Sequence, residues 1–329
     1  MRRLVLTQYN AVLPVMGRLV HLETNSSKLL ESLVELFARY PAVPNRSADF
    51  MWRIVVDSSV TCRPPWPRRS TFSDEGIRYA QFGQRNFVAV DIDAREAIAF
   101  VSEGLFEDGL GFTSPFMDTL FCLTSAGLGL VPFAAACVAS GKNGLLVFGG
   151  ANQGKTTASY LATREALTYH ADQSVYMEIV EGELRGWPDF VPVAFRPETL
   201  QFLPELRSLT DSFCYCDLNF HYMANANADS GRSSFVVPTC CVVLNRESSP
   251  VPNLLRLAAT DSSRILSEHI LFKEDGRFEQ LRLKILAALD HLPFYHLSYG
   301  TNPAIAVPFF RDLLTNCNKQ NPVRQMDTS

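Results

Sequence analysis

The sequence predicts a mixed α/β protein with about two domains. Its 329 residues are about twice the roughly 150 residues of a typical domain. Short apolar segments that read as strands alternate with segments whose apolar residues recur at helical spacing. A glycine-rich loop lies between one such strand and a helix, an arrangement typical of α/β nucleotide-binding proteins.

Composition and charge exclude several classes of protein. Apolar residues make up 47% and charged residues 19%, which excludes intrinsic disorder. Mean hydropathy is +0.02, and no apolar run is long enough to cross a membrane. The net charge of -4 gives no support for a nucleic-acid or membrane partner. Most of the eight cysteines lie in apolar runs, as in a reducing compartment, so we expect a cytoplasmic protein.

The first third of the chain is expected to form short strands and one helix. The predicted strands span residues 17–23, 51–56, 77–82, 87–90 and 97–101. Residues 25–27 contain two serines, which are good N-cap residues, and apolar positions at helical spacing follow them. Three prolines between residues 63 and 69 predict a loop there.

We expect a domain boundary in the acidic, glycine-rich segment from 103 to 114. Ser114 as N-cap and Pro115 at the first helical position predict a helix over 116–128. We therefore predict three segments: a mixed α/β N-terminal domain over 1–110, a nucleotide-binding domain over 111–317 and a polar tail over 318–329. The sequence leaves the role of the N-terminal domain open.

Three further elements are predicted near the C-terminus. The apolar run 235–244 contains Pro238, which predicts an edge strand or a bulged strand. Residues 261–263 are expected to cap a helix that runs to about 271. Apolar residues at helical spacing predict an amphipathic helix over 278–289.

The strongest motif is G-x-x-x-x-G-K-[ST], the pattern of a phosphate-binding loop. It follows the apolar strand 144–148 and leads into a predicted helix that begins near Lys155. The expected nucleotide-binding residues are Gly149, Gly150, Ala151, Asn152, Gln153, Gly154, Lys155, Thr156 and Thr157. A chance glycine-rich loop is the alternative, but the position between a strand and a helix favours nucleotide binding.

Each residue type in this motif has a physical role. Glycines allow successive backbone N–H groups to curl around a phosphate. Lys155 is expected to reach the outer phosphates of ATP, and the hydroxyl of Thr156 is expected to bind Mg²⁺. The N-terminus of the following helix adds partial positive charge.

An acidic residue follows at the end of the next predicted strand, 167–172. Asp172 is a candidate ligand for Mg²⁺ and a candidate catalytic group in phosphoryl transfer. Strict alternation would place His170 on the same side of the strand, where it is a candidate general base. A lone strand histidine is more often a packing residue, and that alternative stays open.

The segment from about 116 to 315 resembles the catalytic domain of HPr kinase/phosphorylase and related proteins. The matching segments are 131–138, 144–146, 149–156, 171–173, 195–200 and 295–300. The resemblance implies a fold akin to HPr kinase and phosphoenolpyruvate carboxykinase. It also implies ATP, Mg²⁺ and transfer of the γ-phosphoryl group to a hydroxyl, often that of a serine. Related kinases form oligomers, so the resemblance allows a homo-oligomer.

The sequence departs from the family at two positions of one subsite. Gln173 stands where the family has a second aspartate, and Ala134 falls where an upstream histidine is expected. The family's motifs for extended substrate binding and phosphorolysis are not recognisable. The sequence therefore leaves two hypotheses. One is an ATP- and Mg²⁺-dependent kinase that acts on a peptide, a protein or a small molecule. The other is a degenerate module that binds nucleotide and signals to a partner. A GTPase-like switch ranks last, because no guanine-reading segment is visible.

Overall fold

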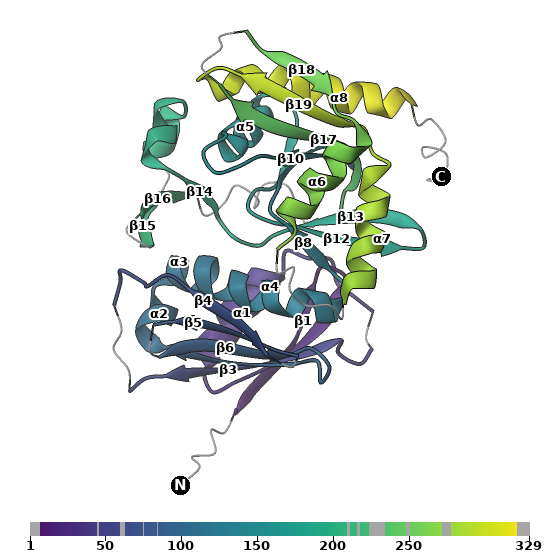
Figure 1. The fold of residues 1–329 in the computed structure, drawn as a ribbon. Helices are drawn as coiled ribbons and strands as arrows, with labels where there is room; N and C mark the ends of the chain where they lie inside the picture. Colours follow the sequence, from purple (N-terminus) through teal and green to yellow (C-terminus); the bar gives the residue numbers. More distant parts are fainter. Residues whose placement is uncertain are drawn as a thin grey trace. The chain divides into compact units, whose positions relative to one another are not determined.

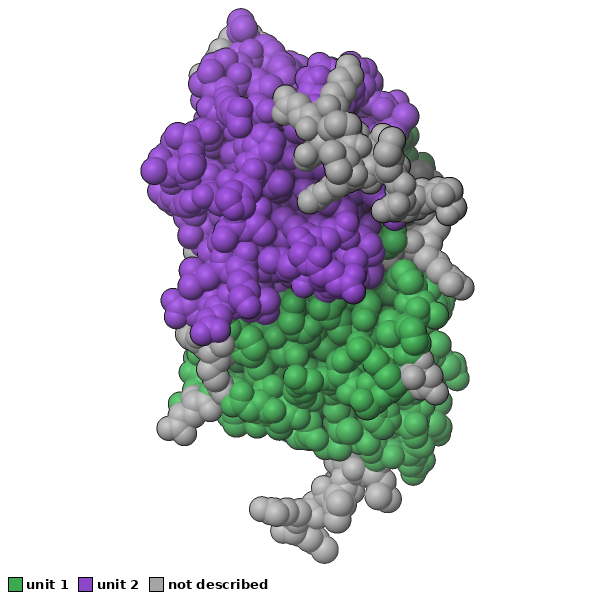
Figure 2. All heavy atoms as spheres, turned by 90° about the vertical axis from the view of Figure 1, so that its right-hand side faces the viewer, with its two compact units in different colours: residues 1–130, 190–234, 272–278 green, residues 131–189, 235–271, 279–329 purple. Residues whose placement is uncertain are grey.

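The computed structural model describes residues 7–44, 46–59, 63–74, 76–83, 85–208, 211–215, 218–223, 234–247, 251–271 and 278–320. The chain forms two compact units, coloured separately in Figure 2. Unit 1 comprises 1–130, 190–234 and 272–278, and unit 2 comprises 131–189, 235–271 and 279–329. Both units are therefore built from segments that are far apart in the sequence. The division expected at residue 110 falls inside unit 1.

Unit 1 contains a mixed seven-stranded sheet of order β1-β2-β3-β7-β6-β5-β4. Its strands are β1 (Tyr9–Val15), β2 (Arg18–Thr24), β3 (Phe50–Asp57), β4 (Ser70–Asp74), β5 (Ile77–Phe82), β6 (Asn86–Asp91) and β7 (Glu96–Ser102). The five strands predicted in this region are confirmed as β2, β3, β5, β6 and β7. The edge strand β4 was not predicted, because all of its residues are exposed and its sequence carries no buried alternation.

Helix α1 (Ser27–Phe37) confirms the predicted helix of the first third (Figure 1). The hydroxyl of Ser26 accepts the backbone N–H of Leu29, as expected of an N-cap. Leu29, Leu33 and Phe37 are buried. One face of the helix therefore belongs to the core of unit 1.

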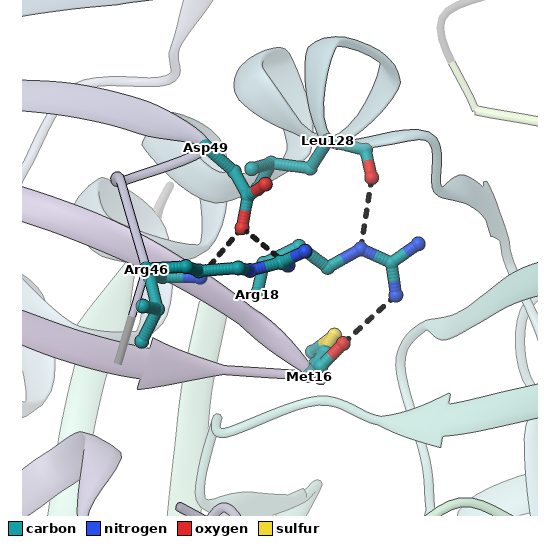
Figure 3. A network of polar contacts seen from close by, with 6 residues as sticks. Met16, Arg18, Arg46, Asp49 and Leu128 are labelled. Carbon is teal, nitrogen blue, oxygen red and sulfur yellow. Dashed lines mark hydrogen bonds and ion pairs between the residues drawn. The ribbon is translucent and has the colours of Figure 1, made fainter. Parts of the chain in front are cut away.

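A polar network fixes the turn between β1 and β2 (Figure 3). Met16 and the glycine after it both have positive φ angles, as a tight two-residue hairpin requires. Arg18 donates to the carbonyl oxygens of Met16 and Leu128, each at 2.9 Å. The carboxylate of Asp49 accepts the backbone N–H of Leu19 at 2.9 Å and pairs with Arg46. Segments more than one hundred residues apart are thus joined within unit 1.

The segment predicted as a domain boundary is largely helical and lies within unit 1. Helices α2 (Glu103–Glu107) and α3 (Gly109–Gly111) begin where the side chains of Ser102 and Asp108 accept backbone N–H groups. Ser114 is no N-cap, because it lies with Pro115 inside a π-helix over Phe112–Met117. Helix α4 (Asp118–Thr124) and a 3₁₀ turn (Ser125–Leu128) complete the predicted helix.

Aromatic packing explains why this helical segment belongs to unit 1. Phe116 lies 5.5 Å from Phe82 of β5 between ring centroids, and Phe121 lies 6.2 Å from Trp52 of β3. Large buried aromatic rings contribute strongly to a core. A second, three-stranded sheet of unit 1 has the order β14-β16-β15, formed by Val193–Phe195, Leu218–Met223 and Asp211–Tyr215.

Unit 2 contains a six-stranded mixed sheet of order β11-β9-β10-β17-β19-β18 and a three-stranded sheet of order β13-β12-β8. The strands of the larger sheet are β9 (Ala136–Ser140), β10 (Asn143–Phe148), β11 (Thr168–Ala171), β17 (Val237–Arg246), β18 (Asn253–Arg256) and β19 (Phe294–Tyr299). Those of the smaller sheet are β8 (Val131–Phe133), β12 (Val175–Val180) and β13 (Glu183–Pro188). Both units therefore confirm the mixed α/β class.

Helices α6 (Ala259–His269) and α7 (Glu279–Asp290) contribute Ile265, Leu266, Ile285 and Leu289 to the core of unit 2. Helices α5 (Lys155–Ala162) and α8 (Ala306–Gln320) contact each other and strands of the larger sheet (Figure 1). The predicted tail begins within the last residues of α8, and 321–329 lie outside the described residues. No helix in the described part of the chain is long and apolar enough to cross a membrane.

Two details of unit 2 differ from expectation. Strand β17 is central rather than an edge, and Pro238 is accommodated by a shift of register between Gly144 and Leu145 of β10. The alternative of a bulged strand is therefore confirmed. Helix α6 begins at Ala259, before the predicted cap, so Ser262 and Ser263 lie inside the helix, with their hydroxyls within hydrogen-bond distance of Asp290 and of the carbonyl oxygen of Ala259.

Candidate functional site

The glycine-rich loop joins the end of β10 to the start of α5. Gly149, Asn152 and Gly154 have φ angles of +142°, +64° and +82°, a region that glycine and asparagine tolerate best. A Cβ on Gly149 would lie 2.9 Å from the carbonyl oxygen of Leu244, and one on Gly154 would collide with the hydroxyl of Tyr299. Both glycines are therefore required by the fold as well as by the motif.

Lys155, the first residue of α5, folds back over the loop. Its Nζ donates to the carbonyl oxygens of Gly149 at 2.7 Å and Gly150 at 3.0 Å. Burial lowers the pKa of Lys155, and the nearby charge of Asp172 opposes that shift. The ammonium is thus held beside the loop by two backbone carbonyl oxygens.

Thr156 and Asp172 are brought together although 16 residues separate them. The hydroxyl of Thr156 donates to Oδ2 of Asp172 at 3.1 Å. Asp172 is only 7% exposed, and its Oδ1 is buried with no hydrogen-bond partner among the described residues. Burial raises the pKa of Asp172 to about 6, opposed by the hydroxyl of Thr156, the charge of Lys155 and the hydroxyl of Tyr169. The site therefore holds a buried carboxylate whose charge these three groups compensate only in part.

The turn after Asp172 is fixed by a residue that the sequence analysis missed. Asp189 is 2% exposed, and its Oδ2 accepts the backbone N–H groups of Gln173 at 3.2 Å and Ser174 at 3.1 Å. The hairpin of β12 and β13 brings Asp189 back to this turn. No local sequence pattern reveals the contact, because it depends on the length of that hairpin.

His170 does not share the surroundings of Asp172, because β11 is irregular there. The register of β11 against β9 shifts between Tyr169 and Ala171, which breaks the alternation assumed from the sequence. The Nε2 of His170 lies 3.1 Å from the carbonyl oxygen of Gly186, and burial lowers its pKa to about 4. The hydroxyl of Tyr169 approaches Asp172 instead, without completing a hydrogen bond of normal geometry.

Two residues from outside the motif hold the loop. The hydroxyl of Tyr299, at the end of β19, donates to the carbonyl oxygen of Gln153 at 2.6 Å. Burial raises the pKa of Tyr299 to about 12. His269, at the end of α6, accepts the backbone N–H of Gly149 through Nε2 at 3.4 Å. Neither residue was identified from the sequence, since each reaches the loop only through strand order and helix packing.

The remaining residues of the predicted nucleotide-binding loop differ in their exposure to solvent. Gly150, Ala151 and Asn152 are exposed at the tip of the loop, whereas Thr157 is buried in α5. The side chain of Gln153 accepts the backbone N–H of Arg246, which ties the loop to the end of β17. The tip of the loop is therefore exposed to solvent.

Ala134 also lies beside a histidine, although it is not one itself. Its backbone N–H donates to the carbonyl oxygen of His269 at 2.8 Å. The resemblance would place a histidine at position 134. In the structure, the neighbouring histidine is His269 of α6.

The described residues contain no group of three or more histidine, cysteine or acidic side chains that could hold a metal ion by themselves. Thr156 and Asp172 supply two oxygen atoms side by side. Mg²⁺ is commonly held in this way, with one or two protein oxygens and with phosphate oxygens and water completing the octahedron. The oxygen donors and the partnerless Oδ1 of Asp172 fit that ion when phosphate is present.

A scan of protein families finds no match for this sequence, and a search of the curated proteins finds none either. Among solved structures, the chain is similar to the Hpr(Ser) kinase/phosphatase from Coxiella burnetii. The match has 11% sequence identity and a TM-score of 0.29, and it covers 58% of this chain and 98% of that chain. It is a weak relation at the level of the fold, and we draw no functional conclusion from it.

Proposed function

We propose that unit 2 binds ATP with Mg²⁺ and transfers the γ-phosphoryl group to a serine-type hydroxyl of a peptide, a protein or a small molecule. The observation that carries the proposal is the contact between Thr156 and the buried carboxylate of Asp172, next to a glycine-rich loop closed by Lys155. The loop, the lysine, the hydroxyl and the acidic residue are the parts that phosphoryl transfer uses in proteins with this motif.

Each residue has one role in the proposed site. The exposed loop from Gly150 to Asn152 offers backbone N–H groups to the phosphates, and the N-terminus of α5 adds partial positive charge. Lys155 exchanges its bonds to loop carbonyls for bonds to the outer phosphates. Thr156 and Asp172 hold Mg²⁺, which when bound neutralises charge on the β- and γ-phosphates.

The charge balance of the site supports this assignment. The ionised form of Asp172 is disfavoured by burial, so a cation beside it is favourable. The charge of Lys155 offsets only part of this cost, and its Nζ bonds to carbonyl oxygens of the loop rather than to the carboxylate. A divalent cation would supply the missing positive charge.

The proposal is tested by thermal unfolding and by ADP formation. MgATP should raise the melting temperature of the wild type. At a ligand concentration of one hundred times the Kd, the free energy of unfolding should increase by about 2.7 kcal/mol. ADP should also form during incubation. Lys155→Ala should lose both effects, whereas Lys142→Ala, in an exposed turn, should keep them.

The outcomes separate the two functions that the sequence leaves open. Stabilisation by MgATP without ADP formation would favour a binding module that reports nucleotide occupancy. Equal behaviour of the wild type and Lys155→Ala in both measurements would refute a nucleotide site at this loop.

A further inference from the structure

We propose that His269 is the general base that takes the proton of the acceptor hydroxyl. This inference rests on the proposed function, because it assigns a residue to the same site. His269 lies outside the glycine-rich motif, on the last residue of α6, and was not a candidate from sequence.

The hydrogen bonds of His269 define its tautomer. Nδ1 lies 2.8 Å from the carbonyl oxygen of Ile265, which can only accept, so Nδ1 carries the hydrogen. Nε2 faces the backbone N–H of Gly149, which can only donate. Nε2 therefore presents a lone pair toward the start of the loop. The ring is held further by Phe148, with ring centroids 5.3 Å apart.

This lone pair is only weakly engaged. The distance from Gly149 N to Nε2 of His269 is 3.4 Å. This is longer than the distance of about 2.9–3.0 Å that is most common for backbone N–H donors. His269 is half-buried rather than enclosed. A hydroxyl group that enters beside the loop can thus replace the backbone N–H as the partner of Nε2.

His269 and Lys155 approach the loop at the same residue. Nε2 of His269 contacts the nitrogen of Gly149, and Nζ of Lys155 contacts its carbonyl oxygen at 2.7 Å. The two side-chain nitrogens are therefore at most about 10 Å apart, given the dimensions of one residue. Lys155 and His269 are therefore close enough to act on the same ATP molecule and its acceptor.

The other candidate bases of the described site are less suitable. The Nε2 of His170 is committed to Gly186, and the residue is 8% exposed. Oδ2 of Asp172 is bonded to Thr156, and Asp172 is 7% exposed. Asp172 is already assigned to Mg²⁺. His269 alone among these three combines an oriented lone pair with access from solvent.

The proposed step balances in atoms and charge. The acceptor hydroxyl gives its proton to Nε2 of His269 as its oxygen forms a bond to the γ-phosphorus of ATP. The bond from the γ-phosphorus to the bridging oxygen breaks, and its electron pair stays on the β-phosphate of ADP. The histidine then releases the proton to water, and the acceptor leaves as a phosphate monoester.

The test compares three variants with MgATP, using water and N-acetylserinamide as acceptors. His269→Gln keeps an oxygen that can accept from Gly149 but cannot act as a base. His269→Ala creates space that free imidazole can enter. His291→Gln, in the exposed turn after α7, is the matched control. Melting temperature without ligand reports folding, thermal titration gives the Kd of MgATP, and ADP formation gives kcat.

We expect His269→Gln to keep the Kd of MgATP while kcat falls about 100-fold or more, the usual contribution of a general base. Imidazole should restore part of kcat in His269→Ala. Three results would overturn the assignment. They are an unchanged kcat in His269→Gln, a loss of MgATP binding in that variant, and a failure of imidazole to restore any kcat in a folded His269→Ala that still binds MgATP. A wild type that forms no ADP, whether or not it binds MgATP, would instead refute the proposed function itself.

Discussion

Replacing Asp172 by asparagine should make the ligand-free protein more stable at neutral pH while abolishing its response to Mg²⁺. Burial raises the pKa of this carboxyl from 3.8 to about 6, so its ionised form destabilises the fold. A difference of about two pKa units corresponds to about 3 kcal/mol. Asparagine has the same shape and no charge, and it removes this cost.

The sign of the effect determines its dependence on pH. The native carboxyl has the higher pKa, so the native state binds more protons between about pH 4 and pH 6. The cost is fully present above the native pKa and disappears as the pH falls toward 4. The advantage of Asp172→Asn should therefore be greatest above pH 7 and shrink through this range.

Thermal unfolding without ligand measures this prediction. About 3 kcal/mol corresponds to a melting temperature roughly 6–12 °C higher, for a unit of about 150 residues. Asp312→Asn, at an exposed position of α8, is the matched control and should not change stability. MgATP should raise the melting temperature of the wild type and of Asp312→Asn, but not that of Asp172→Asn. The quantity to compare is the difference in melting temperature between Asp172→Asn and the wild type. If this difference is no larger at pH 8 than at pH 4.5, the reasoning is refuted.

Three other substitutions, and Gly150→Ala as a control, test the supports of the loop and the core of unit 1. Gly154→Ala should lower the melting temperature and remove the response to MgATP, because its Cβ would meet Tyr299 at φ +82°. Gly150→Ala, whose Cβ would have no neighbour closer than 3.8 Å, should leave ligand-free stability unchanged, and equal effects of the two would contradict this account. Tyr299→Phe loses the 2.6 Å hydrogen bond to Gln153, so the free energy of unfolding should fall by about 1 kcal/mol. An unchanged melting temperature would show that this hydrogen bond does not stabilise the fold. Leu33→Ala, at a fully buried position of α1, should cost about 2–5 kcal/mol in urea unfolding, and a loss below that of a surface substitution would show that α1 is not part of the core.

Local patterns in the sequence were enough for much of the secondary structure. The helix capped by Ser26, the strands β3, β5, β6 and β7, and the strand before the glycine-rich loop were all predicted within a residue or two. Each of them combines an apolar period with a clear start or stop signal. Strand β4 was not predicted, because all of its residues are exposed and its sequence shows no alternation of apolar and polar residues.

The helical segment after β7 shows how local signals mislead. Ser114 and Pro115 looked like the start of a helix, but earlier side chains at Ser102 and Asp108 already begin helical turns. A π-helix accommodates the proline within the segment. Packing against the aromatic core of unit 1 decided this outcome, and packing is not visible in local spacing.

The sequence by itself predicted the glycine-rich loop and its place between a strand and a helix. Glycine positions, Lys155 and Thr156 follow from backbone geometry and charge over eight neighbouring residues. Only the tertiary structure placed Asp172 against Thr156 and directed His170 toward Gly186. Strand order and a single bulge in β11 decide those contacts. His269, Tyr299 and Asp189 reach the site across more distant parts of the chain, where sequence spacing carries no information about distance in space.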